Sequence, residues 1–109
     1  MITILVESLM GGREVVFFQD DPIYIMTYYG WVNKNISNIG EVYKVLQKAL
    51  SLIPEDKPYR GPKEYTEGDY IYSNNFTGEV DNFFGEETLK YKGKEIYKAK
   101  YTGGLVDQR

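Results

Sequence analysis

The chain has 109 residues, a formal net charge of −3, and neither cysteine nor histidine. This length suits one domain spanning residues 1–109. The missing residue types exclude disulfides, thiolate chemistry and histidine-based catalysis or metal binding, and the acidic balance argues against nucleic acid binding by this domain itself. No apolar run is long enough to span a membrane, and Met1 is not followed by a secretory signal, so a cytoplasmic protein with no membrane contact is expected.

The first third of the chain is predicted to form three strands. Aromatic residues are unusually frequent, with eleven tyrosines, five phenylalanines and one tryptophan, and these side chains favour sheets. Ile2–Leu9 is apolar and β-branched, and the glycines at 11 and 12 predict a turn or bulge after it. Glu14–Gln19 and Ile23–Tyr29 follow as strands, separated by a turn at residues 20–22.

The segment Glu41–Ile53 is predicted to be an amphipathic helix. Its apolar residues recur at helical spacing, namely Val42, Val45, Leu46, Ala49, Leu50 and Ile53. Asn38 is a suitable N-cap, and Pro54 would end the helix. A helix of this kind packs one side on a sheet and leaves the other in water.

The rest of the chain is predicted to be a loop followed by three further strands. Three prolines and two glycines between Pro54 and Gly68 indicate a loop. The strands are expected at Asp69–Phe76, at Glu79–Tyr91 with an interruption at Gly85, and at Lys94–Thr102.

Two segments of the chain match without a gap at an offset of 73 residues, Gly12–Gly30 and Gly85–Gly103. Six positions are identical between them: glycine at 12 and 85, glutamate at 14 and 87, isoleucine at 23 and 96, tyrosine at 24 and 97, tyrosine at 28 and 101, and glycine at 30 and 103. We interpret the match as an internal repeat. It predicts an α+β fold in which two three-stranded antiparallel β-meanders, related by a pseudo-twofold axis, are joined by the amphipathic helix in the order βββ-α-βββ.

Three motifs carry a resemblance to a known family: Tyr28-Tyr29-Gly30, the run Lys57–Pro62, and the ending Tyr101–Leu105. Together they resemble a bacterial domain family of unknown function. In that family the domain occurs alone or behind an XRE-type helix-turn-helix in predicted regulators. The resemblance covers nearly the whole chain and implies a bacterial, cytosolic setting. It carries over no catalytic residue.

Two acidic residues and one arginine are candidates for chemistry. Glu14 and Glu87 are counterparts in the repeat, so symmetry could place them together as a paired acid–base or oxygen-ligand metal site. The alternative is a structural role at strand ends, which is the commoner use of such carboxylates. Arg60, between prolines 58 and 62, could bind an anion or simply dock its own loop.

Four tyrosines are candidate ligand-binding residues: Tyr24, Tyr28, Tyr97 and Tyr101. They could line a surface for a small molecule, or belong to the core with their hydroxyls in water. No metal or cofactor is expected.

The two copies differ on the face turned away from the helix. The second copy places Lys90, Lys98 and Lys100 there, which makes it polar. The first copy places mostly apolar side chains there, namely Val15, Phe17, Ile23, Ile25 and Tyr29. Exposed patches of this kind usually mark an interface, so a homodimer joined through this face is predicted.

The sequence therefore favours a non-catalytic binding domain that self-associates and has a ligand-sensing or regulatory role, with a small molecule or another protein as a further partner. The alternatives are a small carboxylate- or metal-dependent enzyme centred on Glu14 and Glu87, and a small-molecule pocket lined by tyrosine between the helix and the sheet.

Overall fold

A computed structural model describes residues 2–7, 11–53 and 61–107, of which only the backbone is described for residues 2–7. These residues form seven strands and one helix. In chain order they are β1 (Ile2–Glu7), β2 (Gly11–Phe18), β3 (Asp21–Val32), α1 (Ile39–Leu50), β4 (Glu64–Glu67), β5 (Tyr70–Glu79), β6 (Asn82–Tyr91) and β7 (Lys94–Leu105). The molecule is elongated, about 48 × 22 × 19 Å.

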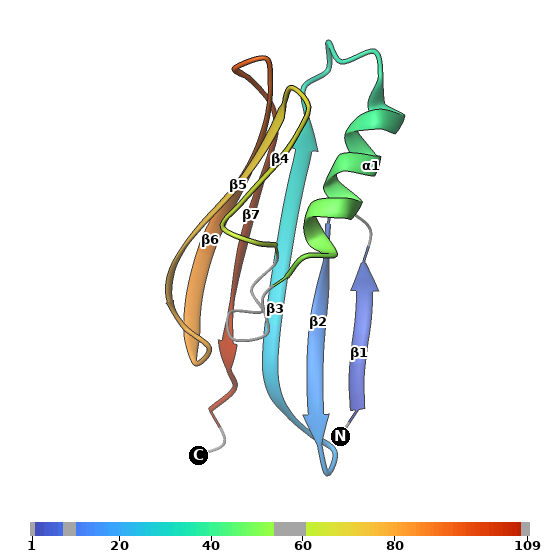
Figure 1. Ribbon diagram of the computed structural model, residues 1–109. Helices are drawn as coiled ribbons and strands as arrows, with labels where there is room; N and C mark the ends of the chain where they lie inside the picture. Colours follow the sequence, from blue (N-terminus) through green and yellow to red (C-terminus); the bar gives the residue numbers. More distant parts are fainter. Residues whose placement is uncertain (1, 8–10, 54–60, 108–109) are drawn as a thin grey trace.

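All seven strands belong to one antiparallel sheet in the order β1-β2-β3-β7-β6-β5-β4. The sheet curls, and α1 lies on the inner side of the curl (Figure 1). We call the side of the sheet opposite α1 the outer face.

The predicted arrangement of two three-stranded meanders joined by a helix is wrong. β3 pairs with β7 from Tyr24↔Leu105 to Val32↔Tyr97, so the two groups of strands merge into one continuous sheet. The sequence pattern within each meander does not show that β3 pairs with β7. The pairing is favourable because it gives hydrogen-bond partners to backbone N–H and C=O groups that two separate sheets would leave unpaired at their edges. A further strand, β4, lies within the predicted loop, where Tyr65 packs against the core.

The hairpins β2–β3 and β6–β7 have the same register at an offset of 73 residues. Gly12 pairs with Tyr28 as Gly85 pairs with Tyr101. Each hairpin has one β-bulge. The register shifts between Val16 and Phe17 in the first hairpin and between Leu89 and Lys90 in the second. Both turns have two residues of positive φ, Gln19 and Asp20 in one and Lys92 and Gly93 in the other. The interpretation of the match as an internal repeat stays a prediction.

Helix α1 is fixed at its start by a reciprocal cap. The Asn38 Oδ1 accepts a hydrogen bond from the Glu41 amide at 3.3 Å, and the Asn38 Nδ2 donates one to the Glu41 carboxylate at 2.7 Å. The helix ends at Leu50, three residues before the predicted end, and Ser51 closes it by donating its hydroxyl to the Lys48 carbonyl. Within the described residues, no helix is long and apolar enough to cross a membrane.

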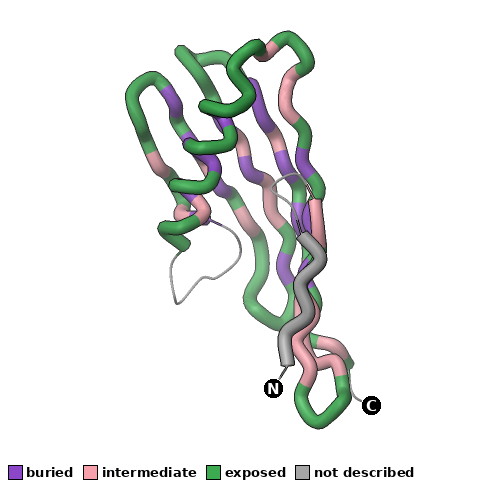
Figure 2. The backbone as a smooth tube through the Cα atoms, turned by 90° about the vertical axis from the view of Figure 1, so that its right-hand side faces the viewer, coloured by how far each residue is buried: buried purple, intermediate pink, exposed green. Residues whose placement is uncertain are grey.

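The core of the described residues has two parts. The first, the helix cluster, lies between α1 and strands β5–β7, and its members are Val42, Val45, Leu46, Ala49, Tyr70, Tyr72, Leu89, Ile96, Tyr97 and Ala99. The second, the sheet cluster, contains Met26, Tyr28, Phe83 and Tyr101. In Figure 2 the buried segments gather on the strands beneath the helix, and burial falls off toward the far end of the sheet.

Candidate functional site

A row of hydrogen-bonded polar side chains is buried on the inner side of the sheet. Glu87 is fully buried and accepts a hydrogen bond from the hydroxyl of Tyr72. Beside it, Asn74 accepts from the Tyr101 hydroxyl at 2.7 Å and donates to the Gly61 carbonyl at 3.1 Å. These bonds connect β5, β6, β7 and the chain entering β4, so the row has a structural role that explains its burial.

The register separates the two candidate carboxylates. Glu14 on β2 pairs with Met26, whereas Glu87 on β6 pairs with Ala99, which is opposite Gly30. β3 and β7 lie between β2 and β6, and the two glutamates are also four residues apart along β3. They are therefore not neighbours in the sheet. No group of three or more aspartates or glutamates suited to a metal ion occurs among the described residues.

The candidate ligand-binding tyrosines are divided between the two clusters. Tyr97 is in the helix cluster. Tyr28 and Tyr101 are buried in the sheet cluster, and Tyr24 packs at its margin, 6.2 Å from Phe83 between ring centroids. Arg60 lies outside the described residues.

Large apolar side chains are exposed on the outer face of two strands, β3 and β6. Tyr29 is 66% exposed and Phe84 59%, and Trp31 and Ile25 are 44% and 40% exposed. The rings of Tyr29 and Trp31 lie 6.1 Å apart. We refer to Ile25, Tyr29, Trp31 and Phe84 as the outer patch.

The predicted interface residues lie along this same side of the first hairpin. Val15 pairs with Ile25, and Phe17 follows two residues later on β2, so both face outward and are half-buried. Ile23 has no partner in the register because it lies at the bulge, so strand alternation does not define its side. Its counterpart Ile96 belongs to the helix cluster together with Tyr97.

Trp31 and Phe84 were not among the predicted interface residues. Trp31 continues the alternation of Ile25, Thr27 and Tyr29, but the strand was expected to end at Tyr29, whereas β3 runs to Val32. Phe84 lies next to Phe83, which is fully buried. Two adjacent residues in a strand point to opposite faces of the sheet. The pair Phe83-Phe84 could therefore have predicted that one of the two phenylalanines lies on the outer face.

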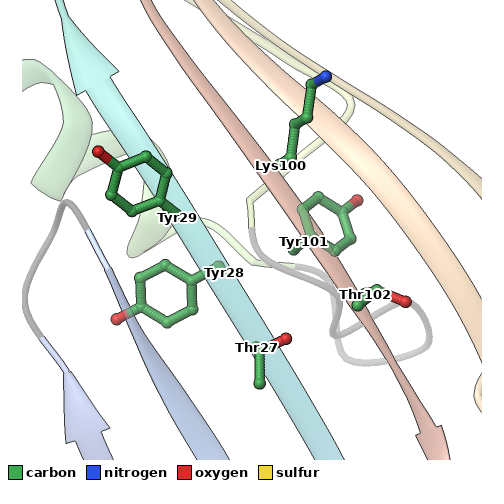
Figure 3. A pocket seen from close by; sticks show the side chains of 6 residues that line it. All are labelled: Thr27, Tyr28, Tyr29, Lys100, Tyr101 and Thr102. Carbon is green, nitrogen blue, oxygen red and sulfur yellow. The ribbon is translucent and has the colours of Figure 1, made fainter.

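Two hollows lie side by side on the outer face. The first, of about 280 Å³, is lined by residues of β3 and β7, namely Thr27, Tyr28, Tyr29, Lys100, Tyr101 and Thr102 (Figure 3). The second, of about 390 Å³, shares Lys100 and Tyr101 with it and extends to Phe84 and Glu86. Together they form a shallow groove that crosses the middle of the sheet.

Charges of both signs border this groove. Lys98 forms ion pairs with Glu86 at 3.0 Å and with Glu95 at 3.6 Å. The hydrogen bond and charge of Glu86, followed by the charge of Glu95, raise the pKa of Lys98 above its usual value. Lys100, two residues further along β7, is exposed and has no ion pair within the described part of the chain.

Comparison with known proteins gives a family but no activity. The model of a family described as "Domain of unknown function (DUF5680)" matches residues 6–106, and the chain belongs to this family. No curated protein and no solved structure matches it.

Proposed function

We propose that this domain is a non-catalytic interaction module that forms a homodimer through the outer face of its sheet. The observation that carries the proposal is the outer patch, in which four large apolar side chains are each at least 40% exposed. Three of the four, Ile25, Tyr29 and Trp31, alternate along one face of β3, and exposed apolar groups gathered in this way mark contact surfaces.

The geometry of the patch supports a second copy of the chain as the occupant. A sheet face packs well against another sheet face, and a twofold axis makes one surface sufficient for both partners. The groove is lined by charges of both signs, Lys100 and Glu86, and Lys98 forms its ion pair with Glu86. In a twofold dimer, the positive side chains of one copy can pair with the negative side chains of the other. Charges of a single sign would instead repel the second copy.

A regulatory setting fits this role. The motifs quoted above resemble a bacterial family whose members occur alone or behind an XRE-type helix-turn-helix, and we propose the same bacterial, cytoplasmic context here. In such regulators a self-associating domain would bring two DNA-binding domains together.

The competing proposal, an enzyme centred on Glu14 and Glu87, gains no support from the strand register, in which these two residues are not neighbours.

Ligand sensing remains a second candidate because the hollow between Thr27, Tyr29 and Lys100 combines an aromatic ring, hydroxyl groups and an ammonium group. A small anion with an aromatic group would match this lining.

Sedimentation of the Ile25→Lys, Tyr29→Lys double variant beside the unmodified protein tests the homodimer. Both substitutions place charges at exposed positions, so the fold should be retained while the dimer is lost. Leu52→Lys is the matched control, because Leu52 is similarly exposed, at 45%, but follows α1 on the other side of the sheet. It should leave the dimer intact.

A monomeric unmodified protein at tens of micromolar, on the order of an ordinary working concentration for micromolar affinity, would refute the proposal. A double variant that stays dimeric would place the interface elsewhere.

A further inference from the structure

A pocket of about 250 Å³ lies between the start of α1 and the ends of β5, β6 and β7, on the other side of the sheet from the outer patch. The segment preceding the helix contributes Asn35 and Ser37 to its lining, and the helix contributes Glu41. The sheet contributes Tyr70, Tyr91 and Ile96.

The pocket has a defined charge. Its lining contains one carboxylate, Glu41, and no lysine or arginine. The remaining polar groups of the lining are neutral amides and hydroxyls. Within the lining a cation would therefore meet a negative charge and no positive side chain, whereas an anion would be repelled by Glu41.

Two aromatic rings complete the lining. The rings of Tyr70 and Tyr91 lie 4.7 Å apart at an angle of 42°, so their faces are not parallel. The ammonium group of Lys92, which is not part of the lining, lies 5.4 Å from the centroid of the Tyr91 ring. This contact shows that the Tyr91 ring accepts a cation–π contact, for which a ligand would compete with Lys92.

The phenol of Tyr70 is held in its neutral form. Burial, followed by a hydrogen bond and the charge of Glu41, raises the pKa of Tyr70 to about 12. The positive end of the helix does not oppose a cation strongly, because Asn38 and Glu41 already cap it.

We propose that this pocket binds a small quaternary ammonium compound, with its cationic head against the tyrosine rings and beside the Glu41 carboxylate. Aromatic rings with a nearby carboxylate are the chemistry that recognises such heads, because the positive charge is spread over methyl groups that also gain apolar contact. The proposal is independent of dimer formation, since the pocket and the outer patch lie on opposite sides of the sheet.

Calorimetric titration with choline tests the proposal, and the uncharged analogue of choline in which carbon replaces nitrogen is the control ligand. The unmodified protein should bind choline saturably and bind the analogue at least about tenfold more weakly, a difference of about 1.4 kcal/mol. Choline binding that is matched by the analogue would refute the role of charge, and no saturable binding up to about 10 mM would refute the site.

Three substitutions assign the binding to the pocket. Tyr91→Leu and Glu41→Gln should each weaken choline binding about tenfold, while Tyr91→Phe, which keeps the ring, should stay within about twofold. Glu41→Gln removes the charge and keeps one accepting oxygen at this position, so it tests charge with little change to the cap.

Tyr43→Leu is the matched control, because Tyr43 is exposed to the same extent as Tyr91, 36%, but lies on α1 outside the pocket. Equal losses in Tyr43→Leu and Tyr91→Leu would overturn the assignment, as would undiminished binding in Glu41→Gln. If Tyr91→Leu does not fold, the comparison of Glu41→Gln with Tyr91→Phe decides.

Discussion

The two hairpins β2–β3 and β6–β7 have the same register, the same bulge and the same left-handed turn, but they differ in what covers them. In the second hairpin Leu89, Tyr97 and Ala99 are at most 2% exposed, because α1 packs on them. In the first hairpin the corresponding Val16 and Tyr24 are half-buried, and Met26 is 8% exposed.

The difference shows that the hairpin backbone does not determine how deeply its residues are buried. One short helix covers part of the inner side of a long sheet, so the first hairpin depends on its own side chains and on whatever meets its outer face. The first hairpin is the less covered of the two, so it leaves more surface available for contact with a partner.

The largest expected effect comes from a matched pair of isoleucines at the two bulges. Ile96→Ala should lower the free energy of unfolding by about 2–5 kcal/mol, because Ile96 is 3% exposed within the helix cluster. Ile23→Ala, at the half-buried counterpart, should cost about 1 kcal/mol. Urea unfolding of both variants measures the difference, and equal costs would show that the first hairpin is covered as well as the second.

A smaller loss is expected from Gly85→Ala in β6. A methyl group at this position would overlap the hydroxyl end of Tyr101 and lie 2.8 Å from the Asn75 carbonyl oxygen, so the variant should lose about 1–3 kcal/mol. Gly40→Ala is the control, because nothing lies within 4 Å of the added atom in the first turn of α1. It should be neutral or stabilising, and a Gly85→Ala variant of unchanged stability would show that Tyr101 moves aside freely.

Tyr101→Phe should cost about 1 kcal/mol, because it removes the donor to the buried Asn74 side chain. Tyr29→Phe is the exposed counterpart on the outer face and should stay within about 0.5 kcal/mol. Thermal unfolding of the two variants at low protein concentration, where any dimer is dissociated, gives the comparison. A loss as large in Tyr29→Phe would mean that its hydroxyl has a structural partner.

The effect of Tyr70→Phe on stability should change with pH. The pKa of Tyr70 is raised from 10.0 to about 12, so the neutral phenol is favoured in the folded state. Its stabilising contribution is fully present below about pH 10 and is lost as the pH rises through 12. The stability of the unmodified protein should therefore fall relative to Tyr70→Phe between these values, and parallel curves would show that Tyr70 titrates normally.

Local patterns predicted the features that depend on short stretches of sequence. The 3.6-residue period identified Val42, Val45, Leu46 and Ala49, and these residues are buried. Leu50, which belongs to the same predicted stripe, is only half-buried.

The features that were missed depend on contacts between distant residues. No local pattern shows that β3 pairs with β7 or that β4 adds a strand at the edge. The bulges rotate Ile96 into the core beside Tyr97, which strict alternation does not allow. The candidate carboxylates Glu14 and Glu87 show the same dependence on distant contacts. They occupy corresponding positions in the two hairpins, but the order of the strands in the sheet keeps them apart.

The pairing of β3 with β7 also has a consequence for the order in which the chain folds. Each hairpin joins residues close in sequence, but Tyr28 meets Tyr101 across 73 residues. Closing so long a loop has an entropic cost that the hairpins do not bear, so we expect the hairpins to form first and the central ladder to form last. Until then β3 and β7 are both open edges, and a β3 strand that meets the β7 strand of another molecule could produce a domain-swapped dimer during refolding at high concentration.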